Sequence, residues 1–110
     1  GPGISVRIDG EITTPWAIDL VNEFFNSGAQ AVSANGIRLN NNTMGFDILP
    51  QGQILLNGSV LSSPYVFEVI GESSALQNIL TLPGGIFDRI EAAFPNLKIE
   101  VVSKEIIQMG

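Results

Sequence analysis

Two Asn-Gly pairs, Asn35-Gly36 and Asn57-Gly58, constrain the fold of this chain more than any other feature of its sequence. Both middle positions of the tightest hairpin turn need a positive φ, which Asn and Gly adopt at little energetic cost. Each pair lies between short apolar runs, so we expect β-hairpins over residues 29–39 and 53–61. Hairpins join antiparallel neighbours, and the sequence therefore predicts a largely antiparallel sheet.

Further strands are predicted outside these hairpins. Residues 4–8 alternate between apolar and polar side chains, which is the period of a half-buried strand. Residues 65–70 are rich in β-branched and aromatic side chains, and residues 46–49 form a shorter candidate. A last strand is expected over residues 97–107, where two consecutive valines break the alternation and predict a bulge or a strand end near Ser103.

Three helices are predicted between these strands. Thr14 precedes a proline and is expected to cap the first helix, which Gly28 ends. The serine pair Ser73-Ser74 offers a cap for the second helix. Apolar residues at helical spacing predict a third helix over residues 86–94.

The order of these elements points to one architecture. The elements run strand, helix, hairpin, hairpin, strand, helix, helix, strand, and without the second hairpin we interpret this as the ferredoxin-like βαββαβ order. Each helix carries a single apolar stripe, so we expect the helices on one face of one antiparallel sheet. The predicted fold is an α+β domain of the ferredoxin-like type with an inserted β-hairpin, and residues 1–110 form a single domain. A doubly wound parallel fold needs more strand–helix alternation than this chain holds.

The chain contains no Cys and no His, which removes many kinds of functional site. Zinc, haem and blue-copper sites draw on these residues, and Ser–His–Asp and Cys–His nucleophiles require them. The acids Asp9, Glu11 and Asp19 match neither a calcium loop nor a carboxylate pair. A hydrolase that uses carboxylates alone stays an alternative, but we expect no enzyme activity, no cofactor and no metal.

The charge of the chain argues against polyanionic partners. Its formal net charge is −6, and the five basic residues are scattered along the sequence at Arg7, Arg38, Arg89, Lys98 and Lys104. We therefore expect no basic stripe, no nucleic-acid partner and no binding to anionic membrane surfaces. Apolar residues make up 45% of the chain and charged residues only 15%, which leaves room for a protein-binding face.

A series of short segments runs in order along nearly the whole chain. They are Gly1-Pro2-Gly3-Ile4, Val21-Asn22-Glu23, Gly28-Ala29, residues 31–36, Arg38, Leu56-Asn57-Gly58, Pro64-Tyr65, Val69-Ile70-Gly71, Leu76 and Leu82-Pro83-Gly84-Gly85. Together they resemble the bacterial DUF881 family, and the spacing from Pro64-Tyr65 to Ile70-Gly71 is the most specific part. Residues 12–18 are more apolar than the usual entry to the first helix in that family.

The resemblance implies a location but no chemistry. Members of the family typically carry an N-terminal membrane anchor, a coiled-coil stalk and then this domain on the extracytoplasmic side of the bacterial cell membrane. In Gram-positive bacteria they are often encoded near cell-division or sporulation genes. We therefore expect this chain to be part of a longer protein that meets the membrane only through an N-terminal anchor outside the sequence given.

Three residues are candidates for contact with a partner: Trp16, Arg38 and Tyr65. Trp16 lies at the entry to the first helix, where an exposed indole would anchor an interface, although core packing is the commoner role of such a ring. Arg38 follows a hairpin turn and would hold an anionic group or pair with a surface acid. Tyr65 belongs to the Pro-Tyr pair of the resemblance.

Two functions remain open at this point. The first is a non-catalytic protein-interaction or self-association module of the bacterial cell envelope, linked to cell division or sporulation, whose partner is another protein or a second copy of the chain. The alternative is a small-ligand sensing domain of the ferredoxin-like type, in which Arg38 would hold an anionic group of the ligand.

Overall fold

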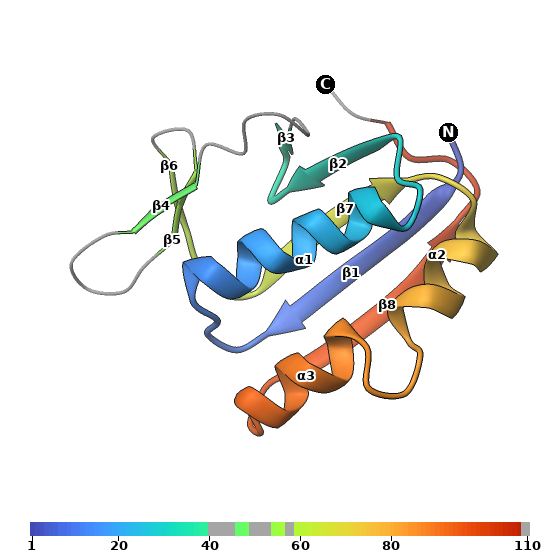
Figure 1. The fold of residues 1–110 in the computed structure, drawn as a ribbon. Coiled ribbons are helices and arrows are strands. Elements are labelled where there is room, and N and C mark those ends of the chain that lie inside the picture. Colours follow the sequence, from blue (N-terminus) through green and yellow to red (C-terminus); the bar gives the residue numbers. More distant parts are fainter. Residues whose placement is uncertain (40–45, 49–53, 57–58, 109–110) are drawn as a thin grey trace.

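The computed structural model describes residues 1–39, 46–48, 54–56 and 59–108. Its largest element is a five-stranded antiparallel sheet with the strand order β3-β2-β7-β1-β8 (Figure 1). The strands of this sheet are β1 (Gly3–Asp9), β2 (Ala31–Ala34), β3 (Ile37–Leu39), β7 (Tyr65–Ile70) and β8 (Lys98–Lys104). The first and last strands of the chain therefore lie side by side.

Strand β1 carries the pattern that the sequence predicts. Ile4, Val6 and Ile8 are fully buried, whereas the residues between them face the other side of the sheet. Val6 lies opposite Phe67 of β7 and Val101 of β8, so three strands contribute apolar side chains to the same face. The predicted half-buried strand is confirmed.

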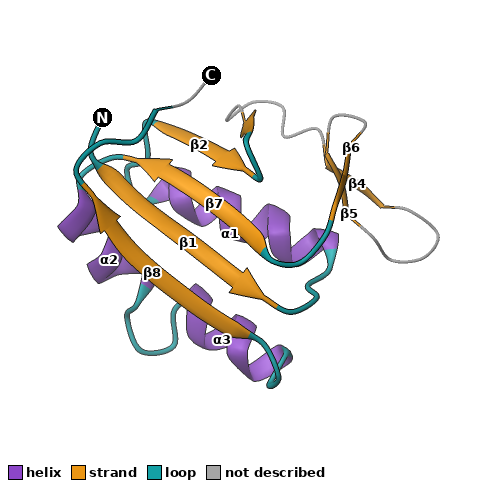
Figure 2. Ribbon diagram, turned by 180° about the vertical axis from the view of Figure 1, so that it is seen from behind, coloured by secondary structure: helices purple, strands orange, loops and turns teal. Residues whose placement is uncertain are grey.

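Within the described residues, three helices cover that apolar face. They are α1 (Thr14–Asn26), α2 (Ser73–Leu80) and α3 (Ile86–Ala93). Seen from behind, the strands lie in front of all three helices (Figure 2). The helices thus form one layer and the sheet a second, as expected for helices that each have one apolar stripe.

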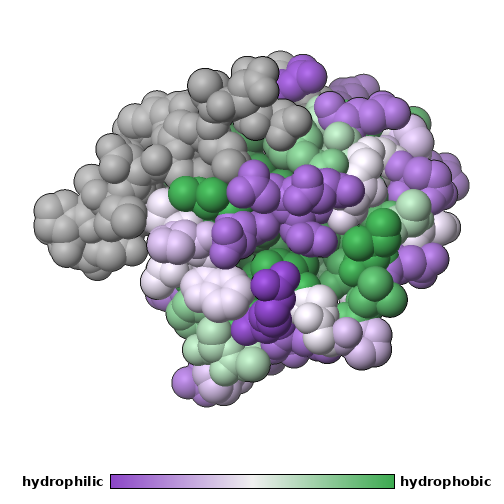
Figure 3. Space-filling view, in the orientation of Figure 1, coloured by the Kyte–Doolittle hydropathy of each residue, from purple (hydrophilic) through white to green (hydrophobic). Residues whose placement is uncertain are grey.

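A single core fills the space between the two layers. Phe24 of α1 and Phe67 of β7 belong to it, with ring centroids 5.8 Å apart and the rings tilted. Burying a side chain of this size contributes roughly 1.5–3 kcal/mol. Figure 3 shows hydrophilic side chains along the outer side of α1 and an apolar area near α2. Ile79 of α2 and Leu82, which follows this helix, are exposed apolar residues.

The end of α1 follows the prediction, and its beginning differs by one residue. Gly28 has a φ of +99° and its N–H donates to the carbonyl of Phe25 at 3.1 Å, which is the helix stop that the sequence predicts. The N-cap is Thr13 rather than Thr14, because the carbonyl of Thr13 accepts the first helical hydrogen bond, from the N–H of Ala17.

The cap of α2 also differs from the prediction. Glu72 is the N-cap, and its carboxylate accepts a hydrogen bond from the backbone N–H of Ala75. The hydroxyl of Ser73 instead donates to the carbonyl of Gly3 in β1, at 2.9 Å. Serine is the more frequent cap in general, but here its hydroxyl ties the start of the helix to the sheet.

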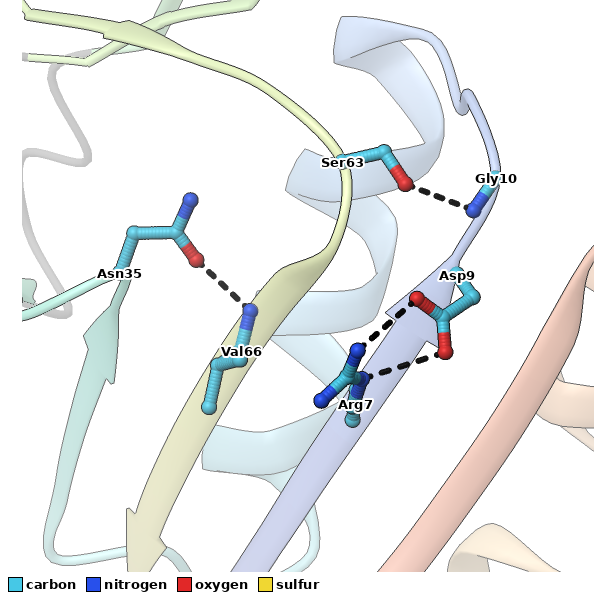
Figure 4. Close-up of polar contacts among 6 residues, drawn as sticks. All are labelled: Arg7, Asp9, Gly10, Asn35, Ser63 and Val66. Atoms are coloured by element: carbon cyan, nitrogen blue, oxygen red, sulfur yellow. Dashed lines mark hydrogen bonds and ion pairs between the residues drawn. The ribbon is translucent and has the colours of Figure 1, made fainter.

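The first Asn-Gly pair forms the predicted turn. Asn35 has a φ of +48° and Gly36 a φ of +84°, and they join β2 to β3. The side-chain oxygen of Asn35 also accepts a hydrogen bond from the N–H of Val66, at 2.7 Å, so the turn is held against β7 (Figure 4). The first hairpin is confirmed.

The second hairpin is part of a separate sheet. Strands β4 (Phe46–Ile48), β5 (Ile54–Leu56) and β6 (Ser59–Leu61) form a three-stranded antiparallel sheet. Strands β5 and β6 pair as predicted, while the Asn57-Gly58 turn itself lies outside the described residues. The inserted segment therefore does not extend the main sheet, and β4 runs beside α1.

The last strand ends rather than bulges. Strand β8 pairs with β1 without interruption over Lys98–Lys104, so the described ladder has no bulge and the strand ends one residue after Ser103. The alternation of apolar and polar residues breaks for another reason: Val102 faces the side of the sheet that no described helix covers, where it is 53% exposed. The coarse prediction of an α+β fold with an antiparallel sheet is confirmed.

Candidate interaction surfaces

One candidate site lies where β1 turns towards α1. Gly10 has a φ of +132°, and a Cβ at this position would meet the Cβ of Leu97 at 2.6 Å. The N–H of Gly10 donates to the hydroxyl of Ser63 at 2.8 Å, so the turn after β1 is tied to the segment that precedes β7 (Figure 4). Only glycine combines this backbone conformation with so close a neighbour.

Glu11 and Tyr65 meet beside this turn. The phenolic oxygen of Tyr65 donates a hydrogen bond to the Oε2 of Glu11 at 2.9 Å, and the tyrosine side chain is only 1% exposed. Burial, followed by the hydrogen bond to Glu11, raises the pKa of Tyr65 well above its ordinary value. Of the three predicted contact residues, Tyr65 is therefore a core residue whose side chain is not presented at the surface.

Trp16 lies at the same end of the molecule. Its ring is partly buried and meets Phe94 edge to face, with centroids 6.1 Å apart and an angle of 77° between the ring planes. A shallow cleft of about 300 Å³ lies beside Phe94, lined by Gly10, Glu11 and residues 93–97. Sequence reasoning predicted neither the contact of Phe94 with Trp16 nor the pairing of Glu11 with Tyr65, because these contacts join residues far apart along the chain.

Arg38 lies elsewhere, on the sheet face that no described helix covers. It is exposed, and its Cα partner in the ladder is Ser33 of β2. The structure therefore brings Trp16 and Tyr65 to one end of the molecule and leaves Arg38 on a different surface.

We call that helix-free side of the main sheet the open face. The ladder registers place seven charged residues there: Arg7, Asp9, Arg38, Glu68, Lys98, Glu100 and Lys104. Four of the five basic residues of the chain are therefore on one surface, although they are scattered in the sequence. Acids are interleaved with them, so the open face carries mixed charge and no basic stripe.

The described residues contain one ion pair, and it lies on the open face. The guanidinium of Arg7 contacts the carboxylate of Asp9 at 3.1 and 3.3 Å (Figure 4). The hydrogen bond to Asp9 and the charge of Asp9 raise the pKa of Arg7, and the charge of Glu100 adds to this effect. Because both partners are exposed, the pair contributes little to stability and mainly sets the local charge pattern.

Strand β8 forms one edge of the main sheet. Among the described strands it neighbours β1 only, so its other side presents backbone N–H and C=O groups that no described strand pairs with. From Val102 to Lys104 every residue of β8 is exposed. The opposite edge, β3, has only three residues.

Among the residues that the structure describes, no group of three or more Asp or Glu side chains is placed to hold a metal ion. No helix in this part of the chain is both long and apolar enough to cross a membrane.

Comparison with known proteins places the chain among bacterial sequences. A family described as "Bacterial protein of unknown function (DUF881)" matches residues 1–110. UPF0749 proteins of Mycobacterium bovis and Mycobacterium tuberculosis are each 29% identical to the chain over 98 residues, which is 83% of this chain and 33% of the relative. The chain thus spans about a third of the length of these curated relatives.

A solved structure shares the fold. The crystal structure of an uncharacterized conserved protein from Mycobacterium tuberculosis superposes with a TM-score of 0.83 at 27% identity, and the match covers 96% of this chain and 76% of that one. Since the family match runs along all 110 residues, this chain belongs to the DUF881 family of bacterial proteins.

Proposed function

We propose that this domain is a non-catalytic protein-interaction module that associates through the edge strand β8 and the adjoining open face. The carrying observation is that β8 is a seven-residue edge strand with free backbone groups on one side and an exposed valine, Val102, in its middle part. A sheet edge of this kind binds another extended strand through main-chain hydrogen bonds, and the side chains select the partner.

The chemistry of the acids supports a role without catalysis. Asp9 is paired with Arg7, and Glu11 accepts the hydroxyl proton of Tyr65 in a hydrogen bond. The chain has neither Cys nor His to act as a nucleophile or base. Asp9 and Glu11 therefore each have a structural partner rather than a reactive one.

The finer fold class is also proposed here. The order β8-β1-β7-β2, the antiparallel pairing of each neighbour and the placement of the helices between β1 and β2 and between β7 and β8 support a ferredoxin-like arrangement. In it, β3 is an added edge strand and β4, β5 and β6 are an insertion.

The cellular setting is proposed from the family context. We place the domain on the extracytoplasmic side of the bacterial cell membrane, behind an N-terminal anchor and a coiled coil, with a link to cell division or sporulation. The relatives are about three times as long as the matched segment, which leaves room for such parts. A coiled coil would bring two copies of the domain together and raise their local concentration.

A photo-crosslinking amino acid at Val102 tests the proposed function in the full-length protein in its own bacterium. We expect adducts with one defined protein, identified by mass spectrometry, which is either an envelope protein or a second copy. The matched control carries the same amino acid at Glu91, an exposed position on α3. Equal adduct patterns at both positions, or none at Val102, would contradict the proposal.

A second candidate function is small-ligand sensing, and the cleft beside Phe94 favours it. The cleft offers an aromatic ring and the carboxylate of Glu11, a combination that suits a ligand with a cationic group. Arg38 lies on another surface and would not take part. Titration with small amines, followed by Trp16 fluorescence, should reveal saturable binding that Glu11→Gln weakens; a signal that does not saturate would exclude this function.

A further inference from the structure

The free side of β8 fits a second copy of the same strand, provided that the helices of both copies stay on one face of a continuous sheet. That condition requires a two-fold axis perpendicular to the sheet, with the two strands antiparallel. In such a pair, residues that lie directly opposite each other project from the same face of the sheet. The two-fold axis therefore passes between two copies of the same residue, and each possible register is defined by which residue of β8 this is. The charges of β8 distinguish these registers.

We propose that two copies of the chain pair through β8 with Val102 on the two-fold axis. This deepens the proposed function, on which it rests, by naming the partner and the register. In this arrangement Val102 meets Val102 of the second copy, and Glu100 of each copy lies opposite Lys104 of the other. All these side chains are exposed in the single chain and project from the open face. An apolar pair flanked by two opposite-charge pairs is a stabilising cross-strand pattern.

Other registers place unfavourable side chains opposite each other. With Val101 on the axis, Lys98 of each copy lies opposite Lys104 of the other, so like charges meet twice. With Glu100 on the axis, two carboxylates face each other. With Ile99 on the axis, Lys98 meets Glu100, but only three residues of each strand overlap. Charged edge strands usually resist pairing, and here the charges leave one register with both good overlap and complementary charge.

A shift in the opposite direction is no better. With Ser103 on the axis, the exposed Val102 would lie opposite a lysine ammonium, and Glu100 would lie opposite a residue beyond the end of the strand. The register with Val102 on the axis pairs residues 100–104 of both copies, which is five of the seven strand residues.

The intramolecular neighbours of the two charged residues support this register. Lys104 lies opposite Gly3 in β1, which has no side chain, and within the described residues Lys104 forms no ion pair. Glu100 lies opposite Arg7, which is already bound to Asp9. A second copy would therefore give Lys104 the carboxylate partner that the described residues of its own chain do not provide.

The side of α2 that lies nearest to this edge carries no charged side chain. Gln77 of α2 donates a hydrogen bond to the hydroxyl of Ser103 on the helix side of β8, so this side of α2 is nearest to the edge. The neighbouring positions one turn away, Ser74 and Thr81, are uncharged and exposed. Two such helices can approach across the axis without like-charge repulsion.

A charge-swap experiment on the 110-residue chain tests the register. Sedimentation equilibrium should show a wild-type dimer. Glu100→Lys and Lys104→Glu should each raise its dissociation constant by about tenfold or more, because each creates two like-charge pairs. The double variant and an equimolar mixture of the two single variants should both recover dimerisation, since every pair is again complementary. Circular dichroism confirms that the variants are folded.

Lys98→Glu is the matched control, because residue 98 has no strand partner in the proposed register. Its dimer should be as stable as the wild type. A stronger dimer would indicate the axis at Val101 and a weaker one the axis at Ile99, and either result overturns the register. Single variants that dimerise like the wild type, or a double variant as weak as the single ones, also overturn it.

The failure of this inference is distinguishable from failure of the proposed function. A chain that stays monomeric at all concentrations overturns self-pairing, whereas crosslinking at Val102 to a different envelope protein would still support the interaction module.

Discussion

At the scale of single residues, the contacts around the end of β1 are the most specific feature of the molecule. Glu11 and Tyr65 are 54 positions apart in the sequence, yet they share a hydrogen bond of 2.9 Å. Gly10 packs against Leu97 and bonds to Ser63, so three distant segments meet at one turn. No local pattern encodes such contacts, and the sequence therefore predicted Tyr65 only as the start of a strand and as a candidate for contact with a partner.

Tyr65 is the only tyrosine of the chain, so its ionisation can be followed directly by ultraviolet absorbance. Burial and then the hydrogen bond to Glu11 raise its pKa. We therefore expect the folded chain to show a titration midpoint above about 10, the ordinary value for tyrosine. Glu11→Gln should lower the midpoint but leave it raised, because burial remains. A midpoint at the ordinary value in the folded chain would contradict the buried placement.

The raised pKa of Tyr65 also makes the stability of the folded chain depend on pH in the alkaline range. The pKa is higher in the folded than in the unfolded chain, so the contribution of Tyr65 to the free energy of unfolding is complete below about pH 10 and is lost as the pH rises further. Urea unfolding, monitored by Trp16 fluorescence, should show a smaller alkaline loss in Tyr65→Phe than in the wild type. An equal loss in both would assign the alkaline sensitivity to other groups.

Gly10→Ala tests the packing of the turn. The new Cβ would lie 2.6 Å from the Cβ of Leu97 at a φ of +132°, so we expect the free energy of unfolding to fall by about 3 kcal/mol or more. Gly84→Ala is the control, because its φ is also positive, at +75°, but no atom lies within 4 Å of the new Cβ. It should lose only about 1 kcal/mol. Equal losses would show that backbone strain alone matters at Gly10.

At the scale of elements, the sequence predicted the type of each helix, strand and turn better than the residues at which it begins and ends. The Asn35-Gly36 turn and the Gly28 stop were correctly predicted because each depends on a positive φ that few residues adopt. Each cap lies one position before the predicted residue or pair: Thr13 is the N-cap of α1 without a side-chain hydrogen bond, and Glu72 is the N-cap of α2. Of the two alternatives predicted near Ser103, a bulge or a strand end, the strand end is confirmed, because β8 ends at Lys104. The exposure of Val102, not an extra residue, breaks the alternation.

Glu72→Ala tests the cap of α2. The carboxylate of Glu72 accepts the N–H of Ala75, so its removal should lower the free energy of unfolding by about 1 kcal/mol. Ser74→Ala is the matched control, because Ser74 is exposed in the same turn and should change stability by no more than about 0.5 kcal/mol. Urea titration of both variants measures the difference in the free energy of unfolding. A larger loss of stability for Ser74→Ala would show that Ser74, and not Glu72, caps the helix.

At the scale of the whole molecule, strand order decides which residues share a surface. The basic residues are scattered in the sequence, but β1, β3 and β8 bring four of them to the open face. The sequence alone could not predict this gathering, because it depends on which strands become neighbours and in which register.

The same order leaves β8 at the edge, where it neighbours β1 alone. An edge strand of seven residues can pair unspecifically with other chains unless its side chains prevent this or a specific partner covers it. The charged side chains of β8 serve both purposes. They oppose most registers and favour the one with Val102 on the axis. Specific self-association and resistance to unspecific pairing therefore come from the same side chains.

Amide hydrogen exchange, measured by mass spectrometry at low and high protein concentration, tests the central claim most directly. If two copies pair through β8, amides within residues 98–104 should exchange more slowly at high concentration, while those of α1 should be unchanged. Exchange in β8 that does not depend on concentration, in a chain that nevertheless dimerises, would show that the copies meet through another surface.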